Sequence, residues 1–483
     1  MKVIFRVDSS SNIGIGHLAR CLKLAKVLKD HDIHFVSKDL NGNGNFLLKK
    51  KYKLHNIHSK NEKNDAVNFI KILKSKININ KDKDYVVLDS YDLKQNWEKK
   101  VKPHTKKLIT IDDRFRESNS DFYLNSNWFF EKNAKFLQFK NSGLLLGPIY
   151  GLINKVKKKN KKKFITIYFG SNDKFNLTTQ TLKNLLKFKE KNIIIILGHN
   201  FSFISDIKKL IKGKKYIKIV DKFQDLGEIF SKTKYFIGAG GSTSTERFLY
   251  KIPSLICPVV KNQKLISQFL YDKKFQHILK KKNFFNYKKW KKAYIFLKKQ
   301  NKIFIKNLNY LSSDDSILRV KNIFNYSNQL FKLIKFDRRF KYVIYNFVNQ
   351  PDAIDSRLTN RYISIKDHEK FVSKIEKSSK ENLYLGLNRG IISGFIRFSI
   401  KQKGLAYIDI FCCPTVRGNY FAKNMLFHGM KDILRTNKKI NFIAEVKKKN
   451  LKSINFFNKY FEKVKVKKNI FIFNKKNIDY NLV

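Results

Sequence analysis

The chain begins with Met1-Lys-Val-Ile-Phe-Arg-Val-Asp-Ser-Ser-Ser-Asn-Ile-Gly-Ile-Gly-His-Leu-Ala-Arg20, and this stretch decides the fold of its first half. Val3 to Val7 is an apolar run that predicts a short buried strand. After a polar turn, Gly14 and Gly16 allow a tight bend and a close approach to a ligand. Leucines at helical spacing then predict a helix from His17 to Lys29. The pattern therefore predicts a strand, a glycine-containing turn and a helix, which is typical of an α/β fold.

His17 lies at the expected start of this helix. A helix start offers free N–H groups and a positive dipole end, which suit an anionic ligand. The same dipole keeps an imidazole neutral and able to act as a base. A lone histidine in such a turn is often a cap or a packed ring, but a base beside an anion site favours a catalytic role.

The glycines also fit a different motif by letter. Gly14-Ile-Gly16-His-Leu-Ala19 matches the dinucleotide-binding fingerprint G-x-G-x-x-A. That fingerprint places its first glycine directly after the strand, whereas six mostly polar residues intervene here. Asp39 is the one candidate for the acid that binds the ribose. The sequence therefore disfavours a dinucleotide-dependent oxidoreductase.

The length and charge of the chain limit the number of domains and the kinds of partner that we expect. The 483 residues are enough for about three domains. The formal net charge of +64 would ordinarily indicate nucleic acid or an anionic membrane as partner. However, lysines dominate the positive charge and are spread along the whole chain, together with many Asn, Ile, Phe and Tyr residues. An AT-rich coding sequence produces this composition, so we expect no specific nucleic-acid partner.

Cysteines and histidines do not form metal-binding patterns. The four cysteines are Cys21, Cys257, Cys412 and Cys413. They lack zinc spacing and are typical of reduced core residues in a cytosolic protein. We expect no metal at the histidine pairs His31/His34 and His55/His58. No apolar run reaches the ~18 residues of a membrane helix, and the N-terminus does not resemble a signal peptide, so we expect a cytoplasmic protein without membrane insertion. The oligomeric state stays open.

Alternating strands and helices divide the chain into regions. We expect one doubly wound α/β domain over residues 1–150 and a second over 160–310. A linker over 311–337 and a third, mixed domain over 338–476 should follow. The expected strands of the first region are Val3–Val7, Ile33–Val36, Tyr85–Leu88, Lys107–Ile111 and Phe122–Leu124, and a further helix is expected over Asp65–Ser75.

The wider N-terminal pattern resembles one enzyme family. Phe5-Arg-Val-Asp8-Ser9-Ser-Ser, followed by Gly14-x-Gly16-His17-x-x-Arg20, is similar to the UDP-sugar hydrolases of pseudaminic acid biosynthesis. Those enzymes are built like GT-B glycosyltransferases but transfer the sugar to water. The resemblance implies a GT-B-like pair of Rossmann-type domains, with His17 as catalytic base. It implies sugar-binding roles for Asp8, Ser9, Gly14, Gly16 and Arg20.

A second element of the expected catalytic site follows another strand. Tyr85-Val-Val-Leu-Asp89-Ser-Tyr91-Asp92 is a buried strand with a polar end. In open α/β sheets, ligands bind beyond the carboxyl ends of the strands. The family carries an aspartate and a catalytic tyrosine here, so we expect Asp89 and Tyr91 beside His17. Ile111-Asp112-Asp113-Arg114 ends the next strand in the same way.

Two glycine-rich turns in the second region predict the UDP site. Phe169-Gly170-Ser-Asn172-Asp173 resembles the family's glycine turn, and Gly238-Ala-Gly240-Gly241 precedes a helix that Ser242 would cap. Free N–H groups there can hold a diphosphate without a metal, and Glu246 can bind ribose hydroxyls. The alternative is a purely structural glycine turn and helix cap. The expected UDP-binding residues are Gly170, Asn172, Gly240, Gly241, Ser242, Thr243, Glu246, Asn262 and Gln263.

The third region resembles the GNAT acetyltransferases. A strand, the turn Arg417-Gly418-Asn-Tyr420-Phe-Ala422 and an amphipathic helix are similar to their pyrophosphate-binding motif, and Asn450 opens a segment like their last conserved helix. The resemblance implies acetyl-CoA as cosubstrate, bound by Arg417, Gly418, Ala422 and Asn450. Tyr420 replaces a usual glycine, and Phe457 stands where many relatives have a tyrosine general acid, which leaves that role to Tyr460 or water. An inactive accessory domain is the alternative.

The combined prediction is a bifunctional enzyme, an α/β GT-B-like pair of Rossmann-type domains followed by an α+β GNAT acetyltransferase domain. The resemblance implies hydrolysis of UDP-2,4-diacetamido-2,4,6-trideoxy-β-L-altrose to UDP and free sugar, and N-acetylation of the 4-amino UDP-sugar that precedes it. A GT-B glycosyltransferase with an acceptor other than water is the alternative enzyme. A basic nucleic-acid-binding protein is the alternative from another class.

Overall fold

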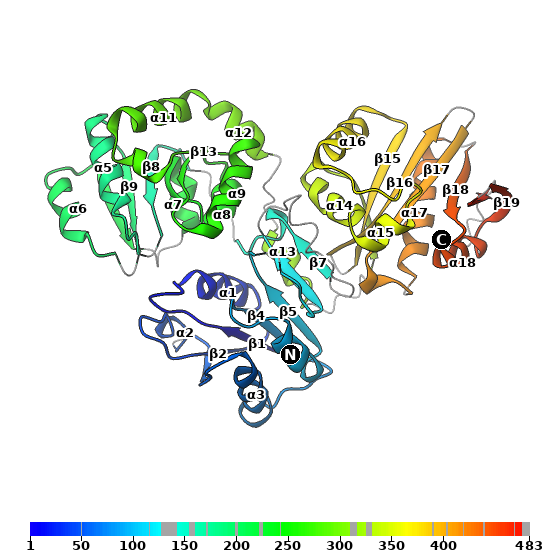
Figure 1. Cartoon of the computed structure of the whole chain (residues 1–483), viewed down its shortest axis with the longest axis horizontal. Helices are drawn as coiled ribbons and strands as arrows, with labels where there is room; N and C mark the ends of the chain where they lie inside the picture. Colours follow the sequence, from blue (N-terminus) through cyan, green and yellow to red (C-terminus); the bar gives the residue numbers. More distant parts are fainter. Residues whose placement is uncertain are drawn as a thin grey trace. The chain divides into compact units, whose positions relative to one another are not determined.

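The structure is a computed structural model (Figure 1) that describes residues 1–49, 51–114, 116–126, 143–153, 160–170, 172–198, 201–221, 226–241, 243–309, 316–324, 331–388, 391–401, 404–418, 420–437, 440–467 and 469–475. These residues form two compact units. The first comprises Met1–Arg114, Leu124–Trp128 and Gly147–Leu318, and the second comprises Phe115–Tyr123, Phe129–Leu146 and Arg319–Val483.

The first sheet has the order β3-β2-β1-β4-β5-β6-β7. Its strands are β1 (Lys2–Val7), β2 (Asp32–Ser37), β3 (Lys53–Asn56), β4 (Tyr85–Asp89), β5 (Lys107–Ile111), β6 (Phe122–Asn125) and β7 (Gly143–Leu146). The pairs among β1 to β5 are all parallel, and β1 lies between β2 and β4. Because the sheet order reverses at β1, the carboxyl ends of β1 and β4 form the position where doubly wound sheets bind ligands.

Helices connect these strands close to the expected positions. They are α1 (Gly16–Val27), α2 (Phe46–Lys49), α3 (Glu62–Ile72) with a π-helical extension (Leu73–Ile77), and α4 (Gln95–Val101) with a 3-10 turn (Lys102–His104). The helix expected over Asp65–Ser75 begins earlier, because the Asn61 side chain accepts a hydrogen bond from the Asn64 backbone N–H and caps α3.

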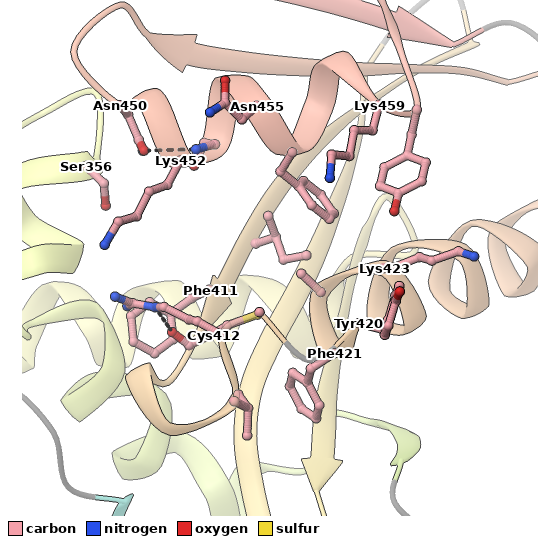
Figure 2. A pocket seen from close by; sticks show the side chains of 18 of the residues that line it. Ser356, Phe411, Cys412, Tyr420, Phe421, Lys423, Asn450, Lys452, Asn455 and Lys459 are labelled. Atoms are coloured by element: carbon pink, nitrogen blue, oxygen red, sulfur yellow. Dashed lines mark hydrogen bonds between the residues drawn. The ribbon is translucent and has the colours of Figure 1, made fainter.

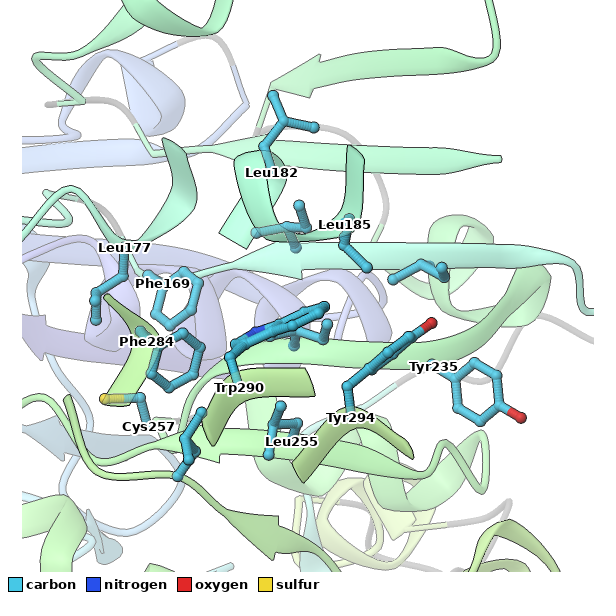
Figure 3. Packing of buried hydrophobic residues seen from close by; sticks show 14 of the residues in the cluster. Phe169, Leu177, Leu182, Leu185, Tyr235, Leu255, Cys257, Phe284, Trp290 and Tyr294 are labelled. Atoms are coloured by element: carbon cyan, nitrogen blue, oxygen red, sulfur yellow. The ribbon is translucent and has the colours of Figure 1, made fainter. Parts of the chain in front are cut away.

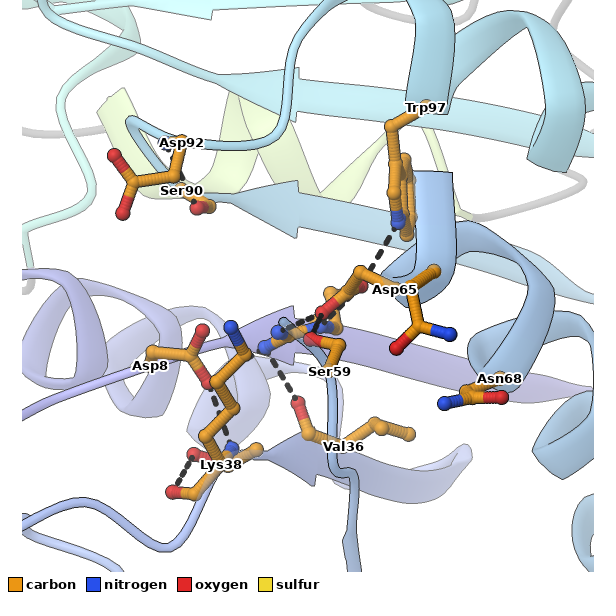
Figure 4. A network of polar contacts seen from close by, with 12 residues as sticks. Asp8, Val36, Lys38, Ser59, Asp65, Asn68, Ser90, Asp92 and Trp97 are labelled. Atoms are coloured by element: carbon orange, nitrogen blue, oxygen red, sulfur yellow. Dashed lines mark hydrogen bonds and ion pairs between the residues drawn. The ribbon is translucent and has the colours of Figure 1, made fainter. Parts of the chain in front are cut away.

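A buried charge network fixes the end of β1 (Figure 4). Arg6 is fully buried, and its guanidinium donates to both carboxylate oxygens of Asp65, at 3.1 and 2.6 Å, and to Asp8 at 2.6 Å. Asp65 also accepts hydrogen bonds from the Trp97 indole and the Ser59 hydroxyl. Bidentate pairing of this kind holds the groups in one geometry. The network therefore ties β1 to α3 and α4 directly below the N-terminal turn.

The second sheet is parallel throughout, with the order β10-β9-β8-β11-β12-β13. Its strands are β8 (Phe164–Tyr168), β9 (Ile193–Leu197), β10 (Ile217–Asp221), β11 (Thr233–Ala239), β12 (Ser254–Cys257) and β13 (His277–Ile278). The helices are α5 (Leu177–Lys187), α6 (Ile204–Ile211), α7 (Leu226–Lys232), α8 (Thr243–Leu249), α9 (Lys261–Asp272), α10 (Lys281–Phe284), α11 (Tyr287–Lys299) and α12 (Asn301–Asn309).

Aromatic side chains fill one face of this second sheet (Figure 3). The Trp290 and Tyr294 rings of α11 stack with centroids 5.0 Å apart and planes inclined by 19°. Phe284 packs edge-on against Phe169, which directly follows β8, with centroids 5.6 Å apart. This core places the turn after β8 at the carboxyl edge of the sheet.

The third sheet has the order β14-β15-β16-β17-β18-β20-β19 and is antiparallel except between β17 and β18. Its strands are β14 (Phe331–Lys335), β15 (Glu381–Asn388), β16 (Ile391–Lys401), β17 (Leu405–Cys412), β18 (Asn441–Lys447), β19 (Glu462–Lys467) and β20 (Ile470–Lys475). The helices from Ser316 onward are α13 (Ser316–Lys321), α14 (Lys341–Val348), α15 (Pro351–Ser356), α16 (Ile365–Lys377), α17 (Phe421–Thr436) and α18 (Leu451–Asn458).

Strands β17 and β18 pair along only part of their length. Their register runs from Leu405↔Asn441 to Ile408↔Ala444, and the rest of β17 continues without a partner in β18. Parallel strands that separate in this way leave an opening between their carboxyl ends. The same sheet starts with β14, which lies inside the segment 311–337 that we expected to be a linker. Its alternating, half-buried residues do not stand out in the sequence as a core strand.

The sheet orders confirm the expected fold class. Two Rossmann-type α/β domains with parallel sheets form the GT-B-like part of the chain, and an α+β domain built on a mixed sheet follows. Among the described residues, no helix combines the length and the apolarity needed to cross a membrane.

Candidate functional site

The first unit contains a cavity of about 530 Å³ to which both Rossmann-type domains contribute. The N-terminal domain supplies the turn before α1, the first residues of α1 and the strand ends of β4 and β5. The second domain supplies both glycine-rich turns and the start of α9. The lining residues are Ser11 to His17, Arg20, Tyr91, Asp113, Tyr168 to Gly170, Asn172 to Phe175, Ala239 to Gly241, Thr243, Val259, Val260, Gln263 and Ile266.

His17 forms a charged cluster with the end of β4. Its Nδ1 lies 2.5 Å from Oδ1 of Asp89, the last residue of the strand. Arg20, one turn further along α1, donates to both oxygens of that carboxylate, at 2.5 and 2.6 Å. Burial alone would raise the pKa of Asp89, but the Arg20 guanidinium and His17 hold it well below its usual range. The ionised carboxylate orients the imidazole at Nδ1, so Nε2 is the nitrogen that can serve a ligand.

Tyr91 stands beside the imidazole. The two rings meet edge to face, with centroids 4.4 Å apart and an interplanar angle of 86°. The Tyr91 hydroxyl donates to Asp113, and the Arg114 guanidinium lies 4.0 Å from the Tyr91 ring centroid. Burial and the neighbouring Asp113 carboxylate raise the pKa of Tyr91 well above its ordinary value. The phenol therefore remains protonated and donates its O–H hydrogen bond to Asp113, so its oxygen can accept a hydrogen bond from another group.

Asp8 and Ser9, which we expected to bind the sugar, support the turn beneath the cavity and are not among its lining residues. Asp8 pairs with Arg6 and accepts a hydrogen bond from the Lys38 backbone N–H at 2.7 Å. The buried Ser9 hydroxyl accepts one from Gly44 at 2.9 Å.

Gly14, Gly16 and Arg20, from the same sequence motif, do line the cavity. Gly14 has a φ of +79°, which L side chains rarely adopt, so the turn requires a glycine there.

The expected UDP-binding turns lie on the same cavity. Gly170 follows β8 with a φ of +99°, and Asn172 lies next to it on the wall. Gly240 and Gly241 follow β11, and Thr243 begins α8. A Cβ at Gly240 would stand 2.5 Å from the Ser267 hydroxyl oxygen, so a larger residue here would have to displace that side chain.

Of the other residues of the expected UDP site, one lies on the cavity wall. Gln263 lines the cavity, and its Oε1 accepts a hydrogen bond from the Val259 backbone N–H at 3.1 Å. Ser242 and the side chain of Asn262 lie outside the described residues.

Glu246 has an unexpected partner from the other domain. Its Oε1 forms an ion pair with Lys23 of α1. Its other oxygen, Oε2, is buried and has no hydrogen-bond partner within the described chain. Both residues line a small cavity of about 80 Å³, which shares Gly16, Arg20, Asp113, Tyr168 and Thr243 with the main one. Lys23 could not be recognised in the sequence among so many lysines, and Asp113 was recognisable only as a polar residue at the end of a strand.

The second unit contains a cavity of about 810 Å³ (Figure 2). Arg417, Gly418, Ala422 and Asn450 all line it, as expected for one shared ligand. Gly418 has a φ of +85°, and a Cβ there would meet nothing within 4 Å. Tyr420 adopts a left-handed φ of +56° and is 75% exposed, and α17 begins at the next residue. The space beside Gly418 is thus free of other atoms, close to the N-terminus of a long helix, although Tyr420 replaces the usual glycine.

Other side chains around this cavity are already engaged. The Arg417 guanidinium pairs with Asp352 and donates to the Cys412 carbonyl at 3.0 Å. The Asn450 side chain caps α18 by accepting the Ser453 backbone N–H at 3.2 Å. Lys423, Lys452 and Lys459 add positive charge to the lining.

An adjoining cavity of about 370 Å³ lies along β16, β17 and β18. It shares Ser356, Ile410, Phe411, Asn450 and Ser453 with the larger one. Arg357, Arg397 and Lys401 line it together with the acidic Asp409 and Glu445. Phe457 lines this smaller cavity, whereas Tyr460 lines the larger one.

Comparison with known proteins relates a part of the chain to a curated enzyme. The chain is 26% identical over 285 residues to the UDP-2,4-diacetamido-2,4,6-trideoxy-beta-L-altropyranose hydrolase of Campylobacter jejuni, a match that covers 57% of this chain and 98% of that protein. It is 28% identical over 275 residues to an uncharacterised protein of Methanocaldococcus jannaschii, which covers 53% of this chain. This match spans 55% of the length of that second relative. No family model matches the chain.

Solved structures similar to the chain include MurG of Acinetobacter baumannii, with 13% identity, a TM-score of 0.49 and coverage of 67% of this chain and 99% of MurG. An N-acetyltransferase of Campylobacter jejuni has 19% identity, a TM-score of 0.24 and coverage of 31% and 99%. The chain is therefore a distant relative of a curated UDP-sugar hydrolase through its sequence.

Proposed function

We propose that the first unit hydrolyses a UDP-sugar to UDP and the free sugar, with UDP-2,4-diacetamido-2,4,6-trideoxy-β-L-altrose as substrate. The observation that carries this proposal is the His17–Asp89 pair on the wall of a cavity that both glycine-rich turns also line. The similarity to the Campylobacter hydrolase supports the choice of substrate.

The chemistry follows from the roles of the two domains. Asp89 accepts a hydrogen bond from the Nδ1–H of His17, and Nε2 takes a proton from a water molecule. The water oxygen attacks the anomeric carbon while the bond from that carbon to the UDP oxygen breaks. Backbone N–H groups of the turns after β8 and β11 stabilise the charge that develops on the leaving diphosphate. General-base assistance of this kind contributes roughly 10²–10⁴-fold.

Tyr91 and Arg20 would complete the sugar site. Because its O–H already donates to Asp113, the Tyr91 oxygen would act as a hydrogen-bond acceptor for N–H or O–H groups of the sugar. Arg20 keeps Asp89 ionised throughout the cycle. Asp8 and Ser9 would act by holding the turn in place.

We propose that the second unit transfers an acetyl group from acetyl-CoA to the amine of a 4-amino UDP-sugar. The turn at Gly418 would hold the pyrophosphate of acetyl-CoA at the start of α17. The acceptor amine would enter through the adjoining cavity and attack the thioester carbonyl carbon. Its nitrogen would lose a proton to water while the C–S bond breaks and the CoA thiolate leaves. Tyr460, which lines the acetyl-CoA cavity, is the phenol available to protonate that thiolate in place of Phe457. Arg357 and Arg397 would attract the negatively charged diphosphate of the acceptor sugar nucleotide.

One experiment tests both activities. The full-length protein is incubated with the 4-amino UDP-sugar, with and without acetyl-CoA, while UDP and free sugar are followed. We expect fast UDP release only when acetyl-CoA first generates the diacetamido substrate, with CoA and UDP formed in equal amounts. If synthetic diacetamido substrate releases UDP only after a sugar or lipid acceptor is added, the protein is a glycosyltransferase and the hydrolase proposal is wrong.

A further inference from the structure

Arg247 on α8 is a buried cation whose charge has no carboxylate beside it in the described part of the chain. The residue is 0% exposed. Its Nη2 donates to the Ser244 hydroxyl at 2.7 Å, whereas Nε and Nη1 have no hydrogen-bond partner among the described residues. The guanidinium carbon lies 4.7 Å from the ring centroid of Phe236 and 5.7 Å from that of Phe248. Aromatic faces attract a cation but do not neutralise it.

Arg6 provides an internal comparison. It is equally buried, yet Asp65 and Asp8 surround its guanidinium with hydrogen-bonding carboxylates. Burial by itself lowers the pKa of an arginine, and it lowers that of Arg247 to about 9, while the carboxylates around Arg6 more than reverse this effect. Leaving a buried charge unpaired is costly, so a protein that keeps one has a use for it.

The position of Arg247 indicates that use. It lies four residues after Thr243, a residue of the cavity wall, and therefore on the same helical face. Side chains of a helix lean toward its N-terminus, and the hydrogen bond to Ser244 shows that Arg247 reaches back to the first turn. Phe236 belongs to β11, the strand that leads into Gly240 and Gly241. The guanidinium thus packs between the strand and the helix that flank the glycine turn on the cavity.

We propose that Arg247 is a positioning residue whose buried charge attracts and orients the diphosphate of the nucleotide at this glycine turn. It acts through its electric field from beneath the loop, and the bound diphosphate is its counter-ion. A charge in a low-dielectric interior acts over a longer distance than one in water. The proposed site would therefore select nucleoside diphosphates over uncharged nucleosides without a bound metal. The inference rests on the proposed UDP site.

The test compares the binding of a charged and an uncharged ligand to the full-length protein, with and without the charge of Arg247. UDP affinity is measured by calorimetry and uridine affinity by NMR titration, for the wild type and for Arg247→Met. We expect Arg247→Met to weaken UDP binding about tenfold or more and to leave uridine binding unchanged. Lys209→Met is the matched control, because it removes the same charge from an exposed site on α6 and should change neither affinity by more than about twofold.

Thermal unfolding of the ligand-free proteins supplies the second readout. Because Arg247 has no counter-charge, Arg247→Met should keep or raise the melting temperature, whereas Arg6→Met should lower it by breaking a buried ion pair. A strongly destabilised Arg247→Met protein would overturn the inference. So would UDP affinity equal to that of the wild type, or an equal loss for UDP and uridine. In a well-folded Arg247→Lys protein, which keeps the charge, a loss of UDP affinity as large as in Arg247→Met would also overturn it. Failure of the wild type to bind UDP would instead refute the proposed UDP site.

Discussion

Nδ1 of His17 and Oδ1 of Asp89 lie 2.5 Å apart although 72 residues separate them in the chain. Strands β1 and β4 are parallel neighbours with Val7 paired to Asp89, so the end of β4 lies beside the turn that leads into α1. The contact with Asp89 engages Nδ1 of the imidazole, so Nε2 is the ring nitrogen that can accept a proton from a ligand or water.

Replacing His17 by alanine should abolish UDP release while UDP binding survives, because the second domain supplies both glycine turns on the cavity. Steady-state UDP release and calorimetry with UDP measure the two properties. His58→Ala, at an exposed position outside the cavity lining, is the control and should retain full activity. Normal turnover in folded His17→Ala protein would exclude His17 as the base.

The Asp89→Asn variant should lower kcat by about 10²–10⁴-fold with a small change in KM, since an amide cannot hold the imidazole in the same tautomer with the same charge. Asp92→Asn is matched in chemistry and lies just beyond the same strand at an exposed position, so it should leave kcat unchanged. A kcat near that of the wild type in Asp89→Asn would show that the carboxylate has no catalytic role.

Glu246→Gln should weaken UDP binding about tenfold to a hundredfold, the equivalent of losing a charged hydrogen bond to a ribose hydroxyl, about 1.5–3 kcal/mol. The Lys23 ion pair occupies the same carboxylate, so Lys23→Met should maintain or tighten UDP binding by removing the competitor. Calorimetry measures both variants. If Lys23→Met weakens UDP binding as much as Glu246→Gln, the Lys23–Glu246 ion pair, and not a contact of Glu246 with the ribose, supports UDP binding.

Gly418→Val should abolish acetyl transfer and leave hydrolysis of the diacetamido substrate intact. The φ of +85° strains a β-branched residue and so closes or distorts the turn that would receive the pyrophosphate. Gly418→Asn tolerates this φ better and should retain part of the acetyl-CoA affinity. Loss of UDP release in folded Gly418→Val protein would show that the two activities are coupled.

His368 should make the stability of the second unit depend on pH. It is 2% exposed, its Nε2–H donates to the Lys341 carbonyl at 2.7 Å, and burial lowers its pKa to about 4. Because the unfolded chain takes up a proton near pH 6.5, stability is complete above that value and falls as the pH decreases toward 4. We expect a loss of about 2 kcal/mol between pH 7 and pH 5, which calorimetric unfolding would measure. His368→Gln should flatten this dependence; an equal slope in the variant would assign it to other groups.

Local sequence patterns determined the elements on which the site rests. The strands β1, β4, β8 and β11 are short, almost continuously buried apolar runs, which the sequence shows directly. The glycines after β1, β8 and β11 are equally local signals, because tight turns favour glycine, and at Gly14 and Gly170 the φ is positive. His17, Asp89, Tyr91 and the glycine turns could thus be named as candidates from the sequence. The acetyl-CoA turn could be named for the same reason.

Tertiary structure alone decided which charged groups pair. The chain carries 102 Lys and Arg residues, so spacing could not distinguish Lys23, which reaches Glu246, from its many equivalents. Asp113 accepts the hydrogen bond of Tyr91, which follows a different strand. Asp8 pairs with its near neighbour Arg6, whose guanidinium is held in turn by Asp65, 59 residues further along the chain. The strand β14 escaped notice because its side chains are half-buried and its partner β15 lies some fifty residues later. Whether a buried charge such as Arg247 has a partner depends on distances in space, and those distances are set by how the sheets and helices pack.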